Sequence, residues 1–263
     1  MLSVIIPAYN EERTLVQVLD HVLALSPQPQ VIVVSDGSTD GTADIIRDYQ
    51  RTHGIIGVVC PVNAGKGAAI QAGLRYANQP YTIIQDADLE YSPAEYQKLL
   101  KEIAHRPKTV VYGSRNLRHP QLRRSHLQYM RFWLGGKVVT LMGNLLFGTH
   151  LTDEATCYKL FPTELLNRMN LKRRGFDFCP EVTGKSLRVG YRIHEVPIDY
   201  VPRSIAEGKK IRPRDGVIAI LVLVWCRVVP MGWLISPKCS TMSEAAATSR
   251  GTPAGGTEVS HAH

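Results

Sequence analysis

Short, wholly apolar segments alternate with helical patterns along the first half of this chain, and this alternation limits its fold more than any other feature. The expected strands lie within residues 3–7, 31–42, 56–62, 81–88 and 109–116, and the intervening helices within residues 11–25, 43–54, 65–78 and 92–106. Strands that are apolar throughout are typical of a parallel sheet covered on both faces. We therefore predict an α/β fold with a mostly parallel sheet and helices on both faces.

The second half of the sequence predicts further helices and a strand, followed by an apolar segment and a tail. Residues 123–148 mix large apolar residues with Arg and Lys, as in a core helix or an amphipathic helix at a lipid surface, and residues 190–203 indicate a last strand. Residues 216–226 are uncharged but fall short of the roughly 20 residues that span a membrane. We expect one domain over 1–215, an apolar interfacial, juxtamembrane or oligomer-contacting helix (alternatively a truncated membrane anchor) over 216–235, and a disordered tail over 236–263.

The charge balance narrows the class of partner. The chain has 31 Lys and Arg against 23 Asp and Glu, a net charge of +8. This indicates an anionic partner, such as nucleic acid, an acidic membrane surface or a phosphorylated substrate, or merely a basic solvated surface. Aromatic residues make up 7% of the chain and are not interleaved with basic ones, so we expect no nucleic-acid partner.

The cysteines and the first residues of the chain indicate the cellular compartment in which the protein is expected. Five cysteines are scattered without a C-x-x-C pair, which argues against a zinc site and a disulfide framework and favours a reducing, cytoplasmic setting. The opening "MLSVIIPAYNEE" reaches a charged loop too soon for a signal peptide.

Each predicted strand ends in polar residues: "AYNE", "SDGSTD", "NAGKG", "QDADLE" and "GSRN". In open α/β sheets ligands bind at the carboxyl ends of the strands, so these segments define the expected site. No G-x-G-x-x-G follows the first strand, and "NAGKGAA" lacks the full P-loop pattern. Its glycines suit the close approach of a helix N-terminus to a neighbour or an anion.

Three carboxylates, Asp86, Asp88 and Glu90, follow a buried strand at alternate positions. Alternate residues of a strand point the same way, and like charges held together are costly unless a cation lies between them. Oxygen ligands without nearby His or Cys suit Mg²⁺ or Mn²⁺, ions that commonly bridge diphosphates. A D-x-D pair alone is common in loops. Its position directly after a buried strand of an α/β pattern is what favours a metal site here.

Together, "SVIIPAYNEERTL", "VIVVSDGSTDGT", "NAGKGAAIQAGL", "IIQDADLEYSP" and "VVYGSRN" resemble the motifs of family 2 glycosyltransferases, in order and spacing. The later "TDEATCYKLF", "FDFCPEVTGKSLRVGYRIHEVPIDYVPR" and "EGKKIRPRDG" resemble the branch that contains dolichol-phosphate mannosyltransferases and other polyprenyl-phosphate sugar transferases. The resemblance covers about residues 1–225 and implies a Rossmann-like GT-A fold.

The resemblance also implies roles for individual residues. The nucleotide-binding candidates are Pro7, Tyr9, Glu11, Asp36, Lys66 and Asp86. Asp36 stands after Ser35, where the family often has an Asp-Asp pair. The metal candidates are Asp86, Asp88 and Glu90, the catalytic candidates are Asp88, Asp153 and Arg115, and the acceptor-phosphate candidates are Arg131, Arg203 and Lys209.

The implied reaction is an inverting transfer of a hexose from a nucleotide sugar, of the UDP-glucose or GDP-mannose type, to a polyprenyl or dolichyl phosphate at the cytoplasmic face of a membrane. A hydroxyl acceptor is the alternative. Asp153 would orient groups for a phosphate acceptor and act as the base for a hydroxyl acceptor. The rivals are a sugar nucleotidyltransferase, whose glycine- and arginine-rich entry loop is absent after the first strand, and a non-catalytic scaffold that binds anionic lipid. The sequence is also compatible with a homo-oligomer.

Overall fold

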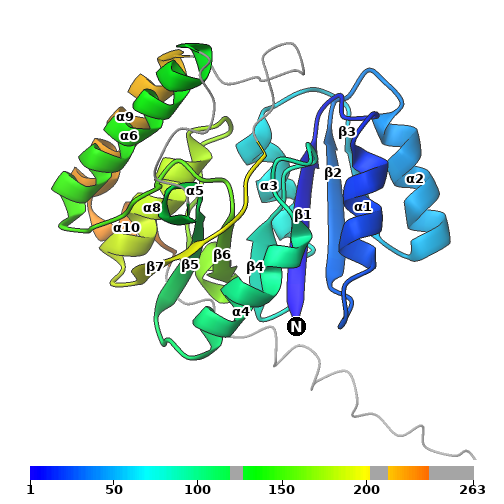
Figure 1. Cartoon of the computed structure of the whole chain (residues 1–263), viewed down its shortest axis with the longest axis horizontal. Coiled ribbons are helices and arrows are strands. Elements are labelled where there is room, and N and C mark those ends of the chain that lie inside the picture. The colour runs from blue at the N-terminus through cyan, green and yellow to red at the C-terminus, as the bar shows by residue number, and fades with distance from the viewer. Residues whose placement is uncertain (119–126, 202–212, 237–263) are drawn as a thin grey trace, which may run out of the picture.

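The computed structural model describes residues 1–118, 127–201 and 213–236. Its centre is a seven-stranded sheet with the order β3-β2-β1-β4-β6-β5-β7 (Figure 1). The strands are β1 (Leu2–Ala8), β2 (Gln30–Asp36), β3 (Ile56–Cys60), β4 (Tyr81–Ile84), β5 (Thr109–Ser114), β6 (Lys159–Pro162) and β7 (Arg192–Pro197). The helices are α1 (Leu15–Leu23), α2 (Thr42–His53), α3 (Lys66–Leu74), a 3₁₀ turn η1 (Pro93–Glu95), α4 (Tyr96–Ala104), α5 (Arg115–Arg118), α6 (Leu127–Phe147), α7 (Thr163–Arg168), α8 (Phe178–Arg188), α9 (Pro213–Val228) and α10 (Met231–Leu234).

The predicted mostly parallel sheet is confirmed, with one exception that the sequence analysis missed. The β3-β2-β1-β4 strands are mutually parallel, and β5 pairs with β7 in parallel. Strand β6 lies antiparallel between β4 and β5 and joins the two groups. It has only four residues, too few for a periodic signal.

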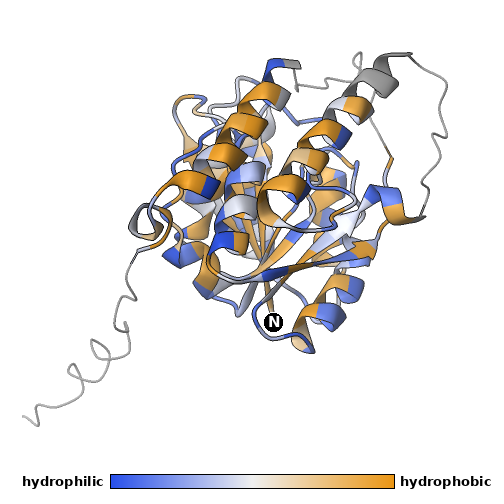
Figure 2. Ribbon diagram, turned by 90° about the vertical axis from the view of Figure 1, so that its left-hand side faces the viewer, coloured by the Kyte–Doolittle hydropathy of each residue, from blue (hydrophilic) through white to orange (hydrophobic). Residues whose placement is uncertain are grey.

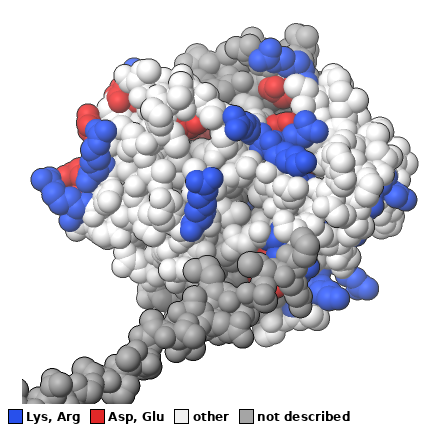
Figure 3. All heavy atoms as spheres, turned by 180° about the vertical axis from the view of Figure 1, so that it is seen from behind, with Lys and Arg blue, Asp and Glu red and all other residues white. Residues whose placement is uncertain are grey.

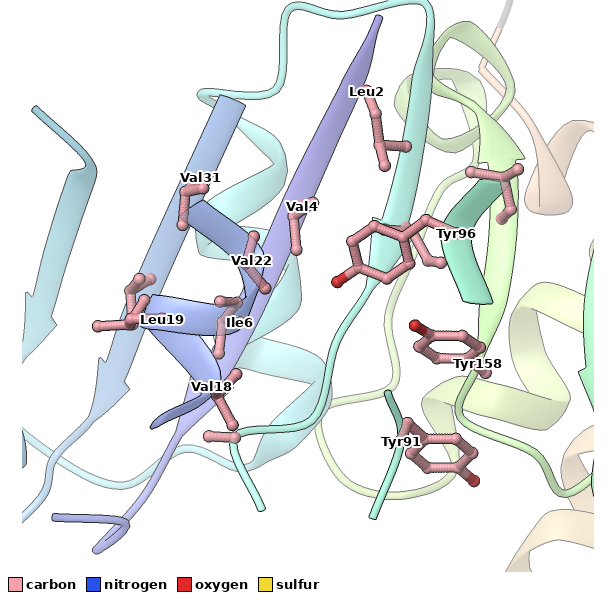
Figure 4. Close-up of a cluster of buried hydrophobic side chains, with 14 of the residues drawn as sticks. Leu2, Val4, Ile6, Val18, Leu19, Val22, Val31, Tyr91, Tyr96 and Tyr158 are labelled. Atoms are coloured by element: carbon pink, nitrogen blue, oxygen red, sulfur yellow. The ribbon is translucent and has the colours of Figure 1, made fainter. Parts of the chain in front are cut away.

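Two apolar cores cover the sheet, one on each face. Helices α1, α2 and α4 pack on one face with side chains such as Val4 and Ile6 of β1 (Figure 4). Helices α3, α7 and α8 pack on the other face, where Ile5 of β1 points. This alternation follows from the two-residue repeat of a strand, and it explains why β1 is apolar throughout.

Strand β1 runs through Pro7 to Ala8, although the prediction ended it at the proline. The carbonyl of Ile5 accepts a hydrogen bond from the Gln85 amide, so the polar groups of Ile5 face β4. Pro7, two residues on, has the same orientation, but the pairing with β4 stops at Ile5. The missing N–H of Pro7 therefore falls beyond the end of β4 and costs the sheet no hydrogen bond.

Helices α6 and α9 lie side by side and pack with α8 outside the sheet (Figures 1 and 2). Leu223 and Cys226 of α9 are fully buried in this packing. Arg188 of α8 donates hydrogen bonds to the carbonyls of Cys226 and Val229, and Arg227 donates to the Leu146 carbonyl. These arginines satisfy carbonyls at the C-terminal ends of both helices.

Across the three described segments, none of the helices combines the length and apolar character needed to cross a bilayer. The boundary predicted at residue 215 falls inside α9, and the tail predicted to be disordered lies outside the described residues from 237 on. The division of the chain into these units stays a prediction.

Candidate functional site

The loops after β1 and β2 are locked together at the carboxyl edge of the sheet. The side-chain oxygen of Asn10 accepts the Thr39 amide at 2.8 Å, and the Glu12 carboxylate accepts the Gly41 amide at 2.8 Å. The amide of Glu11 donates to the Thr42 hydroxyl at 2.9 Å. The nucleotide-binding candidates thus lie at the expected edge, with Pro7 near the end of β1 and Tyr9 and Glu11 on the loop that these hydrogen bonds order.

Asp36, the last residue of β2, is buried and binds the backbone just before α3. Its two carboxylate oxygens accept the amides of Ala64 and Gly65 at 2.9 and 2.8 Å. Gly65 has φ +100°, a conformation that favours glycine, and a Cβ there would meet the Arg174 carbonyl at 2.5 Å. Asp36 therefore sets the position of α3 and of Lys66 at its first turn. A carboxylate oxygen has two lone pairs, so each oxygen can accept a further hydrogen bond from a ligand.

Lys66 makes a short ion pair with Asp86, the first carboxylate of the D-x-D segment. Both side chains are largely buried, and the Lys66 Nζ also lies 3.1 Å from the Cys157 sulfur. Burial lowers the pKa of Lys66, but the charge and hydrogen bond of Asp86, together with the sulfurs of Cys157 and Cys179, outweigh it and hold that pKa well above its usual value. Lys66 is therefore a fixed cation at the edge where a diphosphate is expected.

After Asp86 the chain turns, and the carboxylates of Asp88 and Glu90 have different hydrogen-bond partners. The Glu90 amide donates to the Asp88 carboxylate at 3.2 Å, and Leu89 between them has φ +62°. The Glu90 carboxylate accepts the Tyr200 hydroxyl at 2.9 Å. Within the described residues, no three Asp, Glu, His or Cys side chains gather as a metal site, so the predicted convergence of the three carboxylates is not seen.

Arg115 and Asp153 form a second charged pair at this edge. Arg115 follows β5 and donates to both carboxylate oxygens of Asp153, at 2.7 and 2.6 Å, while its amide donates to the same group at 3.0 Å. Asp153 is 2% exposed. The guanidinium lies 5.1 Å from the ring centre of Tyr200. Both carboxylate oxygens of Asp153 thus hold Arg115 in place.

Glu195 of β7 (Arg192–Pro197) has a structural role beside this pair, because it binds the segment that carries Asp153. Its carboxylate accepts the amides of Thr152 and Asp153 at 2.7 and 2.8 Å, and the Thr152 hydroxyl at 2.9 Å. Glu181 is likewise structural, since it accepts the Lys172 amide at 3.0 Å and pairs with buried Lys185 at 2.8 Å.

The structure also brings Tyr200 and Cys157 to the site, and no sequence pattern predicted a role for either. Tyr200 contacts both Glu90 and Arg115, so it joins the D-x-D turn to the second charged pair. It lies in the segment "IDYVPR", which was noted for its arginine only. Cys157 was set aside as one of several scattered cysteines, because no linear spacing ties it to Lys66.

The structure does not describe the side chains of the three predicted acceptor-phosphate residues. Arg203 and Lys209 lie outside the described residues, and Arg131 lies on α6 with a side chain that is also outside the description. Their roles stay predictions. Figure 3 shows Lys and Arg side chains in several separate groups on the face seen from behind, and not as one continuous patch.

Comparisons with known proteins show which family the chain matches. Residues 3–169 match Glycosyl transferase family 2. The chain is 31% identical over 216 residues to dolichyl-phosphate beta-glucosyltransferase ALG5A of Trichomonas vaginalis, covering 76% of this chain and 65% of that protein. It is 29% identical over 234 residues to undecaprenyl-phosphate mannosyltransferase of Micrococcus luteus, covering 84% of this chain and 92% of that protein.

Among solved structures, glucosyl-3-phosphoglycerate synthase from Mycobacterium tuberculosis with phosphoglyceric acid has a TM-score of 0.63 at 19% identity, covering 88% of this chain and 81% of that one. The same enzyme with Mn²⁺, uridine diphosphate and phosphoglyceric acid has a TM-score of 0.60 at 18% identity, covering 88% and 79%. These likenesses support the predicted fold.

The chain belongs to glycosyl transferase family 2, as predicted. The relatives named above agree with the predicted polyprenyl-phosphate branch. The chain spans just under two thirds of the length of the Trichomonas relative.

Proposed function

We propose that this protein transfers a hexose from a nucleoside diphosphate sugar to a polyprenyl phosphate, with inversion at the anomeric carbon. The family supports a sugar transfer, and the two curated relatives are named for sugar transfer to dolichyl and undecaprenyl phosphates. The bond from the anomeric carbon to the diphosphate breaks as the acceptor oxygen bonds to that carbon from the opposite face.

The observation that carries the choice of acceptor is the Arg115–Asp153 pair. A hydroxyl acceptor needs a base, and Asp153, the candidate for it, is buried with both oxygens bound to Arg115. A phosphate monoester has a second pKa of about 6, so at neutral pH it is largely ionised and needs no base. It needs a fixed cation that aligns it for attack, which is the role we assign to Arg115.

The donor would lie on the β1–β4 side of the edge. The loop that carries Tyr9 and Glu11 would contact the nucleotide, with Asp36 at the base or ribose. Lys66 would neutralise charge on the phosphates, as its fixed position beside Asp86 suggests. These assignments come from the family resemblance, and the locked loops support them, since a preformed site loses little entropy on binding.

The carboxylates at this edge fit a divalent cation. Asp86 and Asp88 offer the hard oxygen ligands that Mg²⁺ and Mn²⁺ prefer, and Asp86 already takes a cationic partner, Lys66. Two carboxylates suffice when phosphate oxygens complete the ligand set. When bound, the ion would offset the charge of the departing diphosphate. Glu90 hydrogen-bonds Tyr200, so the structure favours Asp86 and Asp88 as ligands.

We further propose that α6 and α9 rest on the cytoplasmic surface of a membrane. Each helix carries an exposed apolar stripe at helical spacing, formed by Leu134, Val138, Leu141 and Leu145 on α6 and by Val217, Leu221, Val224 and Val228 on α9. Much of the ribbon of both helices is orange in Figure 2. Trp233 of α10 is 57% exposed and has the Lys172 ammonium 5.1 Å from its ring centre, a pairing suited to the headgroup region.

The test is a donor screen with Mn²⁺ or Mg²⁺ in detergent, scored by release of nucleoside diphosphate. Polyprenyl phosphate and the matching polyprenol are compared as acceptors. We expect release with the phosphate and none above background with the alcohol. Equal release with both would refute the phosphate assignment and favour the hydroxyl-acceptor alternative.

A vesicle assay tests the membrane contact separately. We expect the protein to float with vesicles that contain anionic phospholipid, and Leu141→Asp with Leu221→Asp to abolish flotation. A double variant that floats as the wild type does would contradict the contact. If the wild type stays free of vesicles but forms a dimer that the double variant loses, the stripes are a subunit interface instead.

A further inference from the structure

The segment that follows β7 pairs with the turn that carries the D-x-D residues. Tyr200 and Tyr91 form an antiparallel backbone bridge, and the Val201 amide donates to the Glu90 carbonyl at 3.0 Å. These two segments are more than 100 positions apart in the sequence, as the separation of Tyr200 from Glu90 by 110 residues shows. The backbone of Tyr200 is therefore fixed to the D-x-D turn.

The side chain of Tyr200 contacts two charged groups. Its hydroxyl donates to the Glu90 carboxylate at 2.9 Å, and the guanidinium carbon of Arg115 lies 5.1 Å from the centre of its ring. A guanidinium at this distance from a ring is attracted to it. The ring of Tyr91 packs against Tyr200, with the two centroids 5.1 Å apart. One phenol side chain thus joins the D-x-D turn to Arg115.

Arg115 is consequently held from two directions. Asp153 accepts the Nε and Nη2 protons along one edge of the guanidinium, at 2.7 and 2.6 Å, while Tyr200 lies against the planar group. A guanidinium has five N–H donors, and Asp153 uses two of them, so three are not used by this pair. The Arg115 side chain is 25% exposed, which lets a ligand reach it.

Tyr158 offers a contrast within the same group of aromatic side chains. It is fully buried and stacks on Tyr91, with the ring centres 5.1 Å apart. Its hydroxyl donates to the Ser92 carbonyl at 2.8 Å. Tyr158 therefore supports the core and the backbone of the turn, whereas Tyr200 has its hydroxyl on a carboxylate and its ring beside a cation.

We propose that Tyr200 is a positioning residue for the acceptor phosphate and acts through Arg115. The hydrogen bond to Glu90 fixes the phenol ring, and the ring fixes the tilt of the guanidinium that receives the phosphate. The ring also keeps water from part of the guanidinium, which strengthens the attraction of that group for an anion. This role rests on the phosphate acceptor proposed above, so the test must separate the two.

The test measures how tightly the whole protein binds a short-chain polyprenyl phosphate in detergent, by titration calorimetry without a donor, so it needs no turnover. Tyr200→Phe keeps the ring and loses the hydroxyl, and we expect it to weaken binding about 2- to 10-fold, the range of one hydrogen bond. Tyr200→Leu loses the ring as well and should weaken binding about 10- to 100-fold.

Tyr158→Phe is the matched control, because it also removes one hydroxyl hydrogen bond from a tyrosine of the same aromatic group. It should lower the melting temperature but leave the affinity for the phosphate within about twofold of the wild type. Mn²⁺-dependent binding of UDP or GDP should likewise change by no more than about twofold in Tyr200→Phe. Circular dichroism checks folding, and Tyr200→Phe decides the question if Tyr200→Leu does not fold.

The outcomes separate the role of Tyr200 from the proposed function. Wild-type affinity for the phosphate in the Tyr200 variants would overturn the role of Tyr200 and leave the phosphate acceptor standing. An equal loss in Tyr158→Phe, or an equal loss of nucleotide binding, would show a general loosening of the fold and would overturn it too. A wild type that does not bind polyprenyl phosphate would refute the acceptor assignment, and the role of Tyr200 with it.

Discussion

Asp36 and the Arg115–Asp153 pair lie on the two sides of the carboxyl edge and are held in place in different ways. On the β1–β4 side, Asp36 is held by backbone amides of a neighbouring loop, those of Ala64 and Gly65. On the β5–β7 side, Arg115 and Asp153 hold each other, although they lie on different segments. The first arrangement orders a loop around one side chain, whereas the second depends on a mutual charge pair. Loss of the Asp153 charge should therefore cost more stability than loss of the Asp36 charge.

The largest effect should come from Asp88, because the account places the departing diphosphate beside it. We expect Asp88→Ala to lower nucleoside diphosphate release by at least about 100-fold, the scale of losing one group that stabilises developing charge. The melting temperature should stay close to that of the wild type. Undiminished turnover in the folded variant would show that this side of the edge does not bind the diphosphate.

Asp153→Asn tests the mutual pair directly. The variant leaves the guanidinium of Arg115 without its counter-charge in a largely buried position, and breaking such a pair costs about 3–5 kcal/mol. Chemical denaturation measures the free energy of unfolding. Asp44→Asn is the control, since its ion pair with Arg47 is exposed and should change stability by no more than about 0.5 kcal/mol. Similar losses in both variants would remove the contrast between a buried and an exposed pair.

Asp36→Asn is the matching test on the β1–β4 side. The amide oxygen of asparagine can still accept one of the two backbone amides, and no cation is left unpaired. We expect a loss of about 1–3 kcal/mol, the cost of one buried unsatisfied donor, in the same denaturation experiment. A loss larger than that of Asp153→Asn would reverse the proposed order of the two sides.

The smallest expected effect is a difference between the alkylation rates of two thiols, Cys179 on the β5–β7 side and Cys60 on β3. The pKa of Cys179 is lowered to about 7, so its alkylation by iodoacetamide should rise with pH and level off above about 8. The pKa of Cys60 lies above its usual value, so its rate should still be rising at pH 9. Peptide mapping at a series of pH values checks both. Coincident profiles would mean that the β5–β7 side offers no special thiol.

The sequence predicted the β1–β4 side well because its signals are local. Each apolar strand is followed at once by its polar loop, so Asp36, Lys66 and Asp86 could be placed at one edge from strand order alone. The side-chain partners were not predictable in the same way. The ion pair of Lys66 with Asp86 depends on how α3 approaches β4, which no spacing encodes.

The β5–β7 side was harder to predict. Four-residue β6 runs antiparallel, and Glu195 reaches Thr152 only because β7 lies beside β5. The family resemblance pointed to Asp153 but left open whether it orients groups or acts as a base. The structure supplies its partner, Arg115, and with it the reason to favour orientation.

Titration calorimetry of UDP and GDP, with and without Mn²⁺, tests most directly whether the Asp86–Asp88 edge binds a cation together with a nucleoside diphosphate. We predict that one of the two nucleotides binds the wild type only when Mn²⁺ is present, and that Asp88→Ala abolishes this binding. Binding of equal strength without the ion, or unchanged Mn²⁺-dependent binding in the variant, would contradict the account.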